Sequence, residues 1–389
     1  MVNFLEDQLR ENIHRCFRCG FCKFTSDYSG YNCPIYDKFR TDCYSPGGIL
    51  WLMNAVFKGE IEITPELQNI IFSCTMCGNC SDKCPYEFHK DITNMIIASR
   101  GYLIEKQLIP QNVRNFFKNM IENGQHWKKK EEYTAIPYKK YNYKGGWLLF
   151  LGDMCNYSEY SRQSIVKLMK LLDISGFQYG IIQDEPFPDG NDILMMGETE
   201  MYSYYEEENK ALFNKLEITK IFTYSPHSYN AFKNLYQMNI PDYEVVHYTD
   251  ILSMLLDKGY LHLKNTNTSL KISYHDPCFL GRWNNQYDSA RNILKALPGC
   301  EFIELDYTRK DALCCGGGGG NIYTDMIGSG VNSPSRKRIR EACNKRIDVL
   351  AVSCPVCAAM LQDAVIDEMV QEQLKVKDIS DILIEYVEY

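Results

Sequence analysis

Two adjacent cysteines, Cys314 and Cys315, stand directly before a run of five glycines. Neighbouring cysteines form a strained disulfide because their Cβ atoms diverge on a trans backbone, and they are poorly placed to bind one tetrahedral zinc ion. They suit a metal–sulfur cluster that is wide enough to accept thiolates on two different irons. Glycines lack a Cβ atom, so their backbone can take positive φ and lie against a large inorganic group. We therefore predict a cluster that Gly316, Gly317 and Gly318 contact; a flexible linker behind a buried cysteine pair is the alternative.

Two more cysteine motifs flank this stretch. Cys278 ends an HDPC sequence upstream, and Cys354 and Cys357 belong to a CPVC sequence downstream. His275, in the first motif, could donate a proton to a leaving thiolate, or form a hydrogen bond with the backbone or with a ligand sulfur. Arg282 follows soon after and could bind an anionic substrate, or be an ordinary surface or ion-paired arginine. We expect the cysteines of these motifs to converge on the site of the cysteine pair.

Eight further cysteines form two motifs near the N-terminus. Residues 16–34 read C-x2-C-x2-C, then ten residues and C-P, and residues 74–85 read C-x2-C-x2-C-x3-C-P. The second pattern is typical of bacterial ferredoxins, in which three closely spaced thiolates bind one 4Fe–4S cube and the fourth binds the other. This predicts two cubane clusters with exchanged fourth ligands; a pair of zinc sites is the alternative. The predicted ligands are Cys16, Cys19, Cys22 and Cys84 for the first cluster, and Cys74, Cys77, Cys80 and Cys33 for the second.

The composition indicates a redox protein rather than a disulfide-bonded one. The chain has 389 residues, 17 cysteines and a formal net charge of −8. Repeated C-x-x-C spacing, with no visible secretory signal in residues 1–12, favours metal chemistry in a reducing, cytoplasmic compartment. No apolar run approaches the roughly 18 residues that span a bilayer, and the acidic balance argues against nucleic acid as the main partner. Cys43, Cys300 and Cys343 lie outside the motifs and are interpreted as ordinary thiols.

The residues between and after the two N-terminal motifs show helical signals. Residues 49–57 are apolar, Thr64 is typical of an N-cap before a proline, and an apolar helical pattern starts at Asp91. We therefore expect an all-α domain in residues 1–110. A helix and a charged linker are expected in residues 111–145.

Short β-prone runs alternate with amphipathic stretches in the rest of the chain, which predicts open α/β layers. The predicted strands are residues 147–151, 179–183, 193–196, 220–224, 244–247, 271–274, 301–305 and 348–352.

This α/β region contains an internal repeat. Four short motifs recur in the same order: the first half reads DMC, MMG, SPHS and TDIL where the second reads DPC, CCG, CPVC and SDIL. We predict two duplicated α/β halves, residues 146–262 and 263–389, of which only the second keeps its thiolates. Cys155 alone cannot hold a cluster, so the first half is expected to serve as a scaffold or docking wall.

The tail resembles the cysteine-rich CCG domain family. The whole chain resembles iron–sulfur subunits of heterodisulfide reductase type, related to those of anaerobic glycerol-3-phosphate dehydrogenase and glycolate oxidase. This implies an α+β multidomain fold, in which a helical two-cluster ferredoxin domain precedes two CCG-type halves. It also implies a noncubane 4Fe–4S cluster on the second half, with the ligands Cys278, Cys314, Cys315, Cys354 and Cys357.

The resemblance implies two related activities. In heterodisulfide reductases such clusters cleave a disulfide in two one-electron steps. Relatives with a degenerate half exchange electrons with electron-transfer flavoprotein or a flavin dehydrogenase and pass them toward quinone.

Three functions are therefore open. The chain would be an oxidoreductase subunit that passes electrons from a flavoprotein partner through two cubanes to disulfide–thiol chemistry at the noncubane cluster. It would otherwise be a pure electron-transfer subunit between a flavoprotein and quinone, with any membrane association through a partner, or a zinc-binding interaction module. A basic stretch, residues 333–346, could dock an acidic partner or be a solvated helix face.

Overall fold

The computed structural model describes residues 11–124, 126, 134–141, 146–182, 188–236, 238, 243–266 and 269–388. The chain divides by its internal contacts into two compact units. The first unit contains the N-terminal residues up to His126 together with two later segments, Asp192–Ser203 and Tyr307–Arg338. The second unit contains the sheets of both α/β halves. Residues 1–10 and most of the charged linker, residues 127–133, lie outside the described residues.

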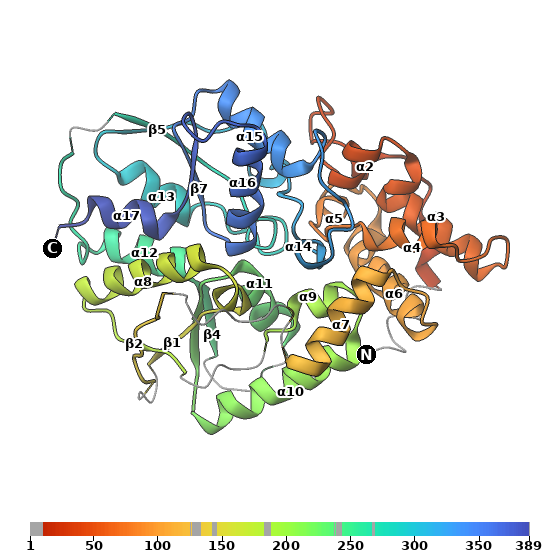
Figure 1. Cartoon of the computed structure of the whole chain (residues 1–389), viewed down its shortest axis with the longest axis horizontal. Helices are drawn as coiled ribbons and strands as arrows, with labels where there is room; N and C mark the ends of the chain where they lie inside the picture. The colour runs from red at the N-terminus through yellow and green to blue at the C-terminus, as the bar shows by residue number, and fades with distance from the viewer. Residues whose placement is uncertain are drawn as a thin grey trace. The chain divides into compact units, whose positions relative to one another are not determined.

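The N-terminal part of the first unit is helical, as predicted (Figure 1). Ser45 and Thr64 begin two of its helices, because their side chains accept hydrogen bonds from the backbone N–H groups of Gly48 and Leu67. A proline follows each of these caps at the first helical position, where an N–H group is not needed. Gly124, with φ 68°, ends the last helix. The helices are α2 Pro34–Phe39, α3 Pro46–Phe57, α4 Pro65–Phe72, α5 Asn79–Lys83, α6 Ile92–Glu105 and α7 Gln111–Asn123, with the 3-10 turns η1 Ile13–Arg15, η2 Phe21–Lys23, η3 Asp42–Tyr44 and η4 Glu87–Asp91.

Two segments from the α/β part of the sequence fold with these helices. The Asp311 carboxylate accepts a hydrogen bond from the Ser26 backbone N–H at 2.8 Å and pairs with Lys83 at 2.8 Å. The Asn112 side chain donates to the Thr324 carbonyl at 2.9 Å. The predicted domain boundaries follow the motifs of the sequence, whereas these contacts group the segments with the N-terminal region, so the boundaries stay predictions. The segments contain η7 Arg309–Asp311 and α14 Asn321–Thr324, nearly all of α9 Asn191–Met195, and the beginnings of α10 Thr199–Lys215 and α15 Pro334–Asn344, which continue into the second unit.

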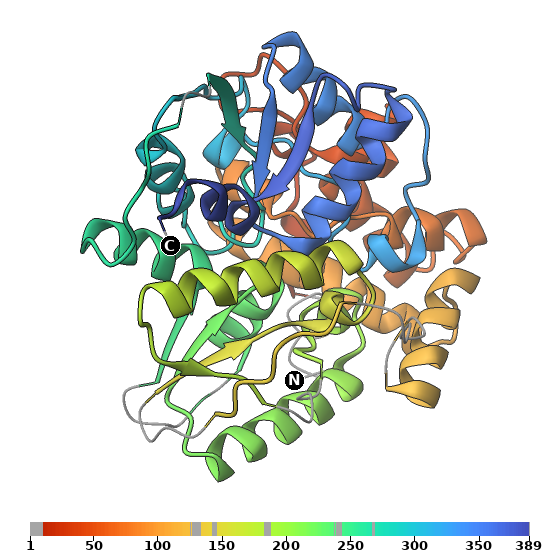
Figure 2. The ribbon, with the colours of Figure 1, turned by 60° about the vertical axis from the view of Figure 1, so that its left-hand side comes forward.

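The second unit contains two four-stranded parallel sheets (Figures 1 and 2). Their strand orders, β2-β1-β3-β4 and β6-β5-β7-β8, are the same topology used twice. In Figure 2 the second sheet is recognised by its teal β5 and its blue β7 and β8. The duplication predicted from the four sequence motifs is therefore confirmed at the level of the sheets. The strands are β1 Trp147–Phe150, β2 Tyr179–Gly180, β3 Lys220–Thr223, β4 Glu244–His247, β5 Leu270–Tyr274, β6 Cys300–Phe302, β7 Val349–Val352 and β8 Lys375–Asp378.

The two halves pack on each other through equivalent helices. The first helix of each half contacts the last helix of the other, so that α8 meets α17 and α12 meets α13. The Ser164 hydroxyl of α8 donates to the Asp381 carboxylate of α17 at 2.9 Å, and the Ser289 hydroxyl of α13 donates to the Asp250 carboxylate of α12. One continuous hydrophobic core includes residues of both halves. The helices are η5 Asp153–Asn156, α8 Glu159–Ile174, α11 Pro226–Asn230, η6 Ala231–Leu235, α12 Tyr248–Asp257, α13 Ser289–Ala296, α16 Pro355–Asp367 and α17 Ile379–Tyr386.

One predicted strand is wrong and one strand was missed. Residues 193–196 lie in and just after helix α9, because a short apolar run fits a buried helix as well as a buried strand. The Asp189 side chain accepts the Asn191 backbone N–H at 2.8 Å and so turns the chain into this helix. The missed strand β8 carries charged residues that hide its apolar period. None of the helices within the described ranges has the length and hydrophobicity that crossing a bilayer requires.

Candidate metal centres

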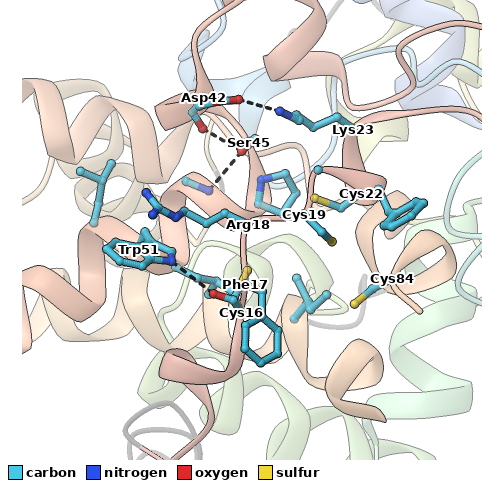
Figure 3. A pocket seen from close by; sticks show the side chains of 18 of the residues that line it. Cys16, Phe17, Arg18, Cys19, Cys22, Lys23, Asp42, Ser45, Trp51 and Cys84 are labelled. Carbon is cyan, nitrogen blue, oxygen red and sulfur yellow. Dashed lines mark hydrogen bonds and ion pairs between the residues drawn. The ribbon is translucent and has the colours of Figure 1, made fainter. Parts of the chain in front are cut away.

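A cavity of about 470 Å³ lies beside the first cysteine motif (Figure 3). Its lining includes Cys16, Cys19 and Cys22 from that motif and Cys84 from the end of the second motif. The structure thus brings together the four side chains predicted to bind the first cluster, including the exchanged fourth cysteine. Their ligation of a cluster stays a prediction.

Charged and aromatic residues shape the wall of this cavity. The Trp51 indole N–H donates to the Cys16 carbonyl at 3.2 Å, and the Arg18 guanidinium lies 3.5 Å from the centre of the Trp51 ring. Lys23 also lines the cavity and pairs with Asp42 at 2.6 Å. Two cations therefore stand beside a group of thiols, and they would lower the electrostatic cost of binding a negatively charged cluster there.

The two N-terminal motifs share one backbone shape. Arg18 and Gly20 have φ angles of 55° and 90°, and Met76 and Gly78, at the equivalent positions of the second motif, have φ angles of 52° and 75°. These left-handed residues curl the chain between successive cysteines, so that thiols two residues apart can face one centre. The glycine after the second cysteine of each motif is a sequence signal for this shape, although the shape was not predicted from the sequence.

The four cysteines predicted to bind the second cluster are all buried. Burial raises the pKa of the Cys33 thiol well above its usual value, and the neighbouring Cys77 and Cys74 add to this shift. The pKa of Cys80 is raised in the same way, by burial first and by a set of neighbours that includes Cys74 and Cys33. Cys33 is therefore close to the second motif, as the exchanged assignment requires.

The chemistry of both groups fits metal binding. Burial raises the pKa of Cys22 to about 12 and the pKa of Cys74 to about 11. Crowded, dehydrated thiols of this kind resist ionisation, and a bound metal core reverses that preference because coordinated thiols lose their protons. The gathering of thiols from distant parts of the sequence is consistent with the predicted ligand sets, which stay predictions.

The glycine run belongs to the first unit and lies against the second cysteine motif. Cys314 and Cys315 are buried, and the Cys314 sulfur is 3.6 Å from the Thr75 hydroxyl. Gly319 has φ 62°, and a Cβ atom there would lie 2.6 Å from the Cys74 carbonyl oxygen. The lack of a side chain at Gly319 therefore allows the glycine run to pack closely against the backbone of the second cysteine motif. Contact of a cluster with the three glycines that follow Cys315 remains a prediction.

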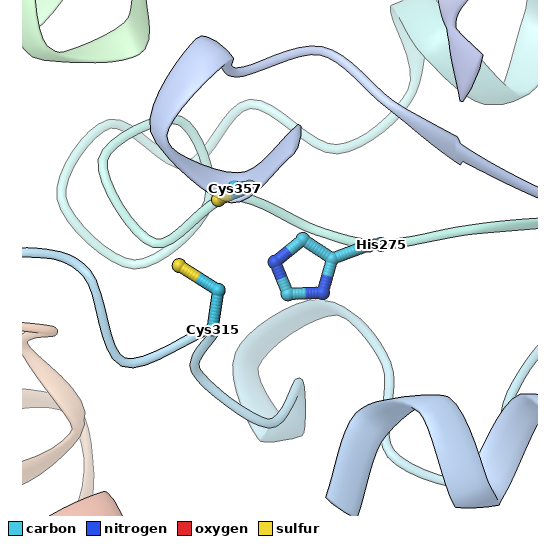
Figure 4. Close-up of side chains that lie close together, drawn as sticks. All are labelled: His275, Cys315 and Cys357. Carbon is cyan, nitrogen blue, oxygen red and sulfur yellow. The ribbon is translucent and has the colours of Figure 1, made fainter. Parts of the chain in front are cut away.

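The second unit supplies the remaining thiols, Cys278, Cys354 and Cys357, which are all buried. Cys354 is the N-cap of α16, and its sulfur accepts the Cys357 backbone N–H at 3.4 Å. His275 follows β5, and its backbone N–H donates to the Ala351 carbonyl of β7 at 3.0 Å. Its ring and the Cys357 sulfur offer ligand atoms within 4.8 Å of each other. Figure 4 draws these two side chains together with that of Cys315.

The aspartate of the HDPC motif anchors the loop that carries Cys278. Asp276 forms a buried, two-pronged ion pair with Arg291, at 2.6 and 2.8 Å. Arg291 also pairs with Glu304 at 2.7 Å. Paired charges with such geometry hold a loop rigidly, since losing one partner would leave a buried charge uncompensated. Asp276 is therefore a positioning residue for the cysteine two residues later.

A residue of the degenerate half reaches the cysteines of the complete half. His227 lies in α11, is buried, and its ring centre is 4.6 Å from that of Phe279. Burial by itself would raise the pKa of Cys354, but hydrogen bonds from Cys357 and from the His227 side chain outweigh it and lower this pKa to about 5. His227 was not predicted from the sequence, although it stands inside the SPHS motif that corresponds to CPVC.

Other predicted residues are less informative. Arg282 is partly buried on the loop after Cys278, and a role in substrate binding stays a prediction. Cys155 is buried, and its thiol donates to the Gly152 carbonyl at 2.9 Å. The basic stretch in residues 333–346 is largely paired within the chain, Lys337 with Asp37, Arg340 with Glu368 and Lys345 with Asp306.

Two protein-family models match the chain. A 4Fe-4S dicluster domain matches residues 12–88, and a cysteine-rich domain, CCG, matches residues 272–362. These two stretches contain the cysteines of every predicted cluster.

Several curated proteins are similar over much of the chain. The probable iron-sulfur-binding oxidoreductase FadF of Bacillus subtilis is 29% identical over 82% of this chain and 46% of its own length. The EtfAB:quinone oxidoreductase of Syntrophomonas wolfei is 26% identical over 96% of this chain and 58% of its own. This chain thus spans about half the length of these two relatives.

A third relative matches over almost its whole length. It is a subunit of the dihydromethanophenazine:CoB–CoM heterodisulfide reductase of Methanosarcina mazei, and it is 24% identical over 99% of this chain and 95% of its own length. The chain therefore contains a 4Fe-4S dicluster domain and a cysteine-rich CCG domain, and its homologues include this heterodisulfide reductase protein.

Proposed function

We propose that this chain is an iron–sulfur oxidoreductase subunit that carries electrons between a flavoprotein partner and a third, noncubane cluster. The observation that carries the proposal is the pairing of each three-cysteine motif with a fourth cysteine from the other motif. Such an exchange, with the second motif reading C-x2-C-x2-C-x3-C-P, is the arrangement of a two-cluster ferredoxin. We therefore assign two cubane clusters to the N-terminal region in this proposal.

The third cluster would be held by Cys278, Cys314, Cys315, Cys354 and Cys357. The five-cysteine set rests on the CCG resemblance, and the burial of all five thiols supports it. When bound, such a cluster supplies one-electron redox chemistry and an iron to which a sulfur can bind.

Residues near Cys314 indicate a route for electrons between the second cubane and the third cluster. The Cys314 sulfur lies 3.6 Å from the Thr75 hydroxyl, one residue from the Cys74 ligand of the second cubane. Burial raises the pKa of Cys74, and the nearby Cys314 is among the further causes that raise it. An electron at the second cubane would therefore need only a short step to the cysteine pair.

His275 is a candidate to hold or deliver a proton at this end of the path. Its ring is buried near the Cys357 sulfur, where a leaving thiolate would need a proton. A hydrogen bond from His275 to a ligand sulfur is the other role that this position supports.

A pure electron-transfer role is the second candidate function. One relative is named an EtfAB:quinone oxidoreductase, and that name favours a flavoprotein donor and a quinone acceptor. In this version the third cluster is a relay, and chemistry takes place on a partner chain.

The two functions separate in one anaerobic experiment. Protein purified without oxygen should contain about twelve irons per chain, by the count of four irons in each of three clusters. The reduced protein is then mixed with the coenzyme M–coenzyme B heterodisulfide or with a quinone analogue. Release of free thiols supports disulfide chemistry, whereas reoxidation by quinone or flavoprotein without thiol release supports the relay. Zinc in place of iron would reject both.

A further inference from the structure

Arg100 is a fully buried cation at the meeting point of three segments of the first unit. Its exposed fraction is 0%. Within the described part of the chain, its guanidinium donates only to main-chain carbonyl oxygens. The acceptors are Ile71 at 3.1 and 3.2 Å, Phe72 at 3.0 Å, Cys74 at 2.5 Å, Met195 at 2.7 Å and Gly319 at 3.2 Å.

Two of the three segments that meet at Arg100 carry, or directly follow, predicted cluster ligands. Cys74 begins the second cysteine motif, Gly319 belongs to the glycine run after Cys315, and Met195 ends α9. Their approach is tight enough to require glycine, since a Cβ atom at Gly197 would lie 2.6 Å from the Arg100 Cβ atom. The packing thus fixes the guanidinium in one place.

A buried charge surrounded by neutral carbonyls is costly unless an anion lies nearby. Among the carbonyls that accept from Arg100, that of Cys74 belongs to a predicted cluster ligand and lies 2.5 Å from the guanidinium. Four thiolates give a cubane cluster a net negative charge. The cluster predicted at Cys74 is therefore the anion that would compensate the buried charge of Arg100.

We propose that Arg100 is a positioning residue that sets the reduction potential of the second cubane and holds the glycine run of the third cluster against it. The proposal rests on the proposed function, because it needs clusters at both places. A fixed positive charge favours the reduced, more negative form of a cluster, so Arg100 would raise the potential at the step that leads to Cys314 and Cys315.

The test compares Arg100→Gln, which removes the charge and keeps hydrogen-bond donors, with Arg100→Lys, which keeps the charge. Arg114→Gln is the matched control, because Arg114 is an exposed arginine of the same unit that also donates to a main-chain carbonyl, that of Gln107, at 2.9 Å. Each protein is purified anaerobically, its iron is counted, and the midpoint potential of each cluster is measured by an EPR-monitored redox titration.

Arg100→Gln should shift the potential of the Cys74-based cluster to more negative values by about tenfold in the reduction equilibrium, or about 59 mV for one electron. Arg100→Lys and Arg114→Gln should titrate near the wild-type potential. If Arg100→Gln loses the second cluster while Arg100→Lys keeps it at the wild-type potential, the requirement for charge is equally supported.

Two results would overturn the proposal. One is an unchanged potential in Arg100→Gln with full iron content. The other is equal loss of iron in Arg100→Gln and Arg100→Lys, which would indicate shape rather than charge. Both results leave the wild-type clusters in place, so they differ from failure of the proposed function, in which the wild-type protein itself would contain no iron–sulfur clusters.

Discussion

The two α/β halves share a backbone and differ in their sulfur atoms. Gly197 and Gly316, which close the MMG and CCG motifs, both have φ 92°. Ser225 and Cys354 are equivalent N-caps, each accepting a backbone N–H of its own helix through its side chain. The first half thus keeps the same loop shapes, although two of its three counterparts of the cysteine motifs, MMG and SPHS, lack the cysteines. These loop shapes therefore do not require the thiols of the second half.

The first half has also acquired a contact that the second half lacks at the equivalent position. His227 corresponds to Val356 when SPHS is aligned with CPVC. Its side chain forms a hydrogen bond with Cys354, a predicted ligand of the other half. The degenerate half therefore contacts a predicted ligand of the complete half through its SPHS loop.

The largest difference between the halves should follow from removing one thiol on each side. Cys315→Ser should abolish the EPR signal of the third cluster and leave both cubanes, because the remaining four thiols cannot replace the paired ligand. Cys155→Ser, the control in the first half, should leave all three signals unchanged. Loss of all clusters in Cys315→Ser would show that the halves and the N-terminal region are not independent.

A second comparison replaces the aspartate at equivalent positions of the two halves, Asp276 and Asp153. Asp276→Asn should destabilise the holoprotein by about 3 kcal/mol, because Arg291 would keep a buried charge with a weakened partner. Asp153→Asn, at the equivalent and partly exposed position of the first half, should cost about 1 kcal/mol or less. Anaerobic denaturation followed by tryptophan fluorescence measures both, and equal costs would contradict the difference between the loops.

The caps of the two closing helices should give opposite pH dependence. His247 caps α12 and Asp378 caps α17, and each is the last paired residue of its edge strand. Burial lowers the pKa of His247 to about 3, so in acid the unfolded chain takes up a proton that the folded chain refuses. Burial, with the nearby Asp381, raises the pKa of Asp378 to about 7, so the folded chain keeps a proton that the unfolded chain has lost.

Between about pH 5 and 6.5 these two groups therefore act against each other. His247 makes the free energy of unfolding rise with pH, and Asp378 makes it fall, each by up to about 1.4 kcal/mol per pH unit. Asp378→Asn should leave a stability that rises more steeply with pH, and His247→Gln one that falls. Urea denaturation at three pH values checks the signs, and parallel slopes in both variants would refute the assignment.

The smallest effect is expected from His227. His227→Val places the residue of the complete half in the degenerate one and removes the donor to Cys354. The potential of the third cluster should become more negative, since hydrogen bonds to ligand sulfurs stabilise the reduced form. The cubane potentials should not change, and Val356→Ile serves as a control for packing near the same loop. An unchanged third potential would reduce His227 to a core residue.

Much of this arrangement could be predicted from the sequence, and the failures have physical causes. Thr64 and the proline after it correctly predicted the start of a helix, because helix capping depends only on residues close in sequence. The exchange of Cys33 and Cys84 was inferred from a known spacing, and their ligation stays a prediction. Residues 193–196 were misassigned because four apolar residues carry no period. Arg100 and His227 were missed because their roles depend on partners far away in the chain, and single arginines and histidines give no sequence signal.

The exchange of contacts between α8 and α17 on one side and α12 and α13 on the other is what a two-fold axis produces. Each side even repeats a serine-to-aspartate hydrogen bond. A pair of identical chains, each one half long, would meet through the same self-complementary surface. One half expressed alone should accordingly form a homodimer, and the present chain joins two such copies covalently.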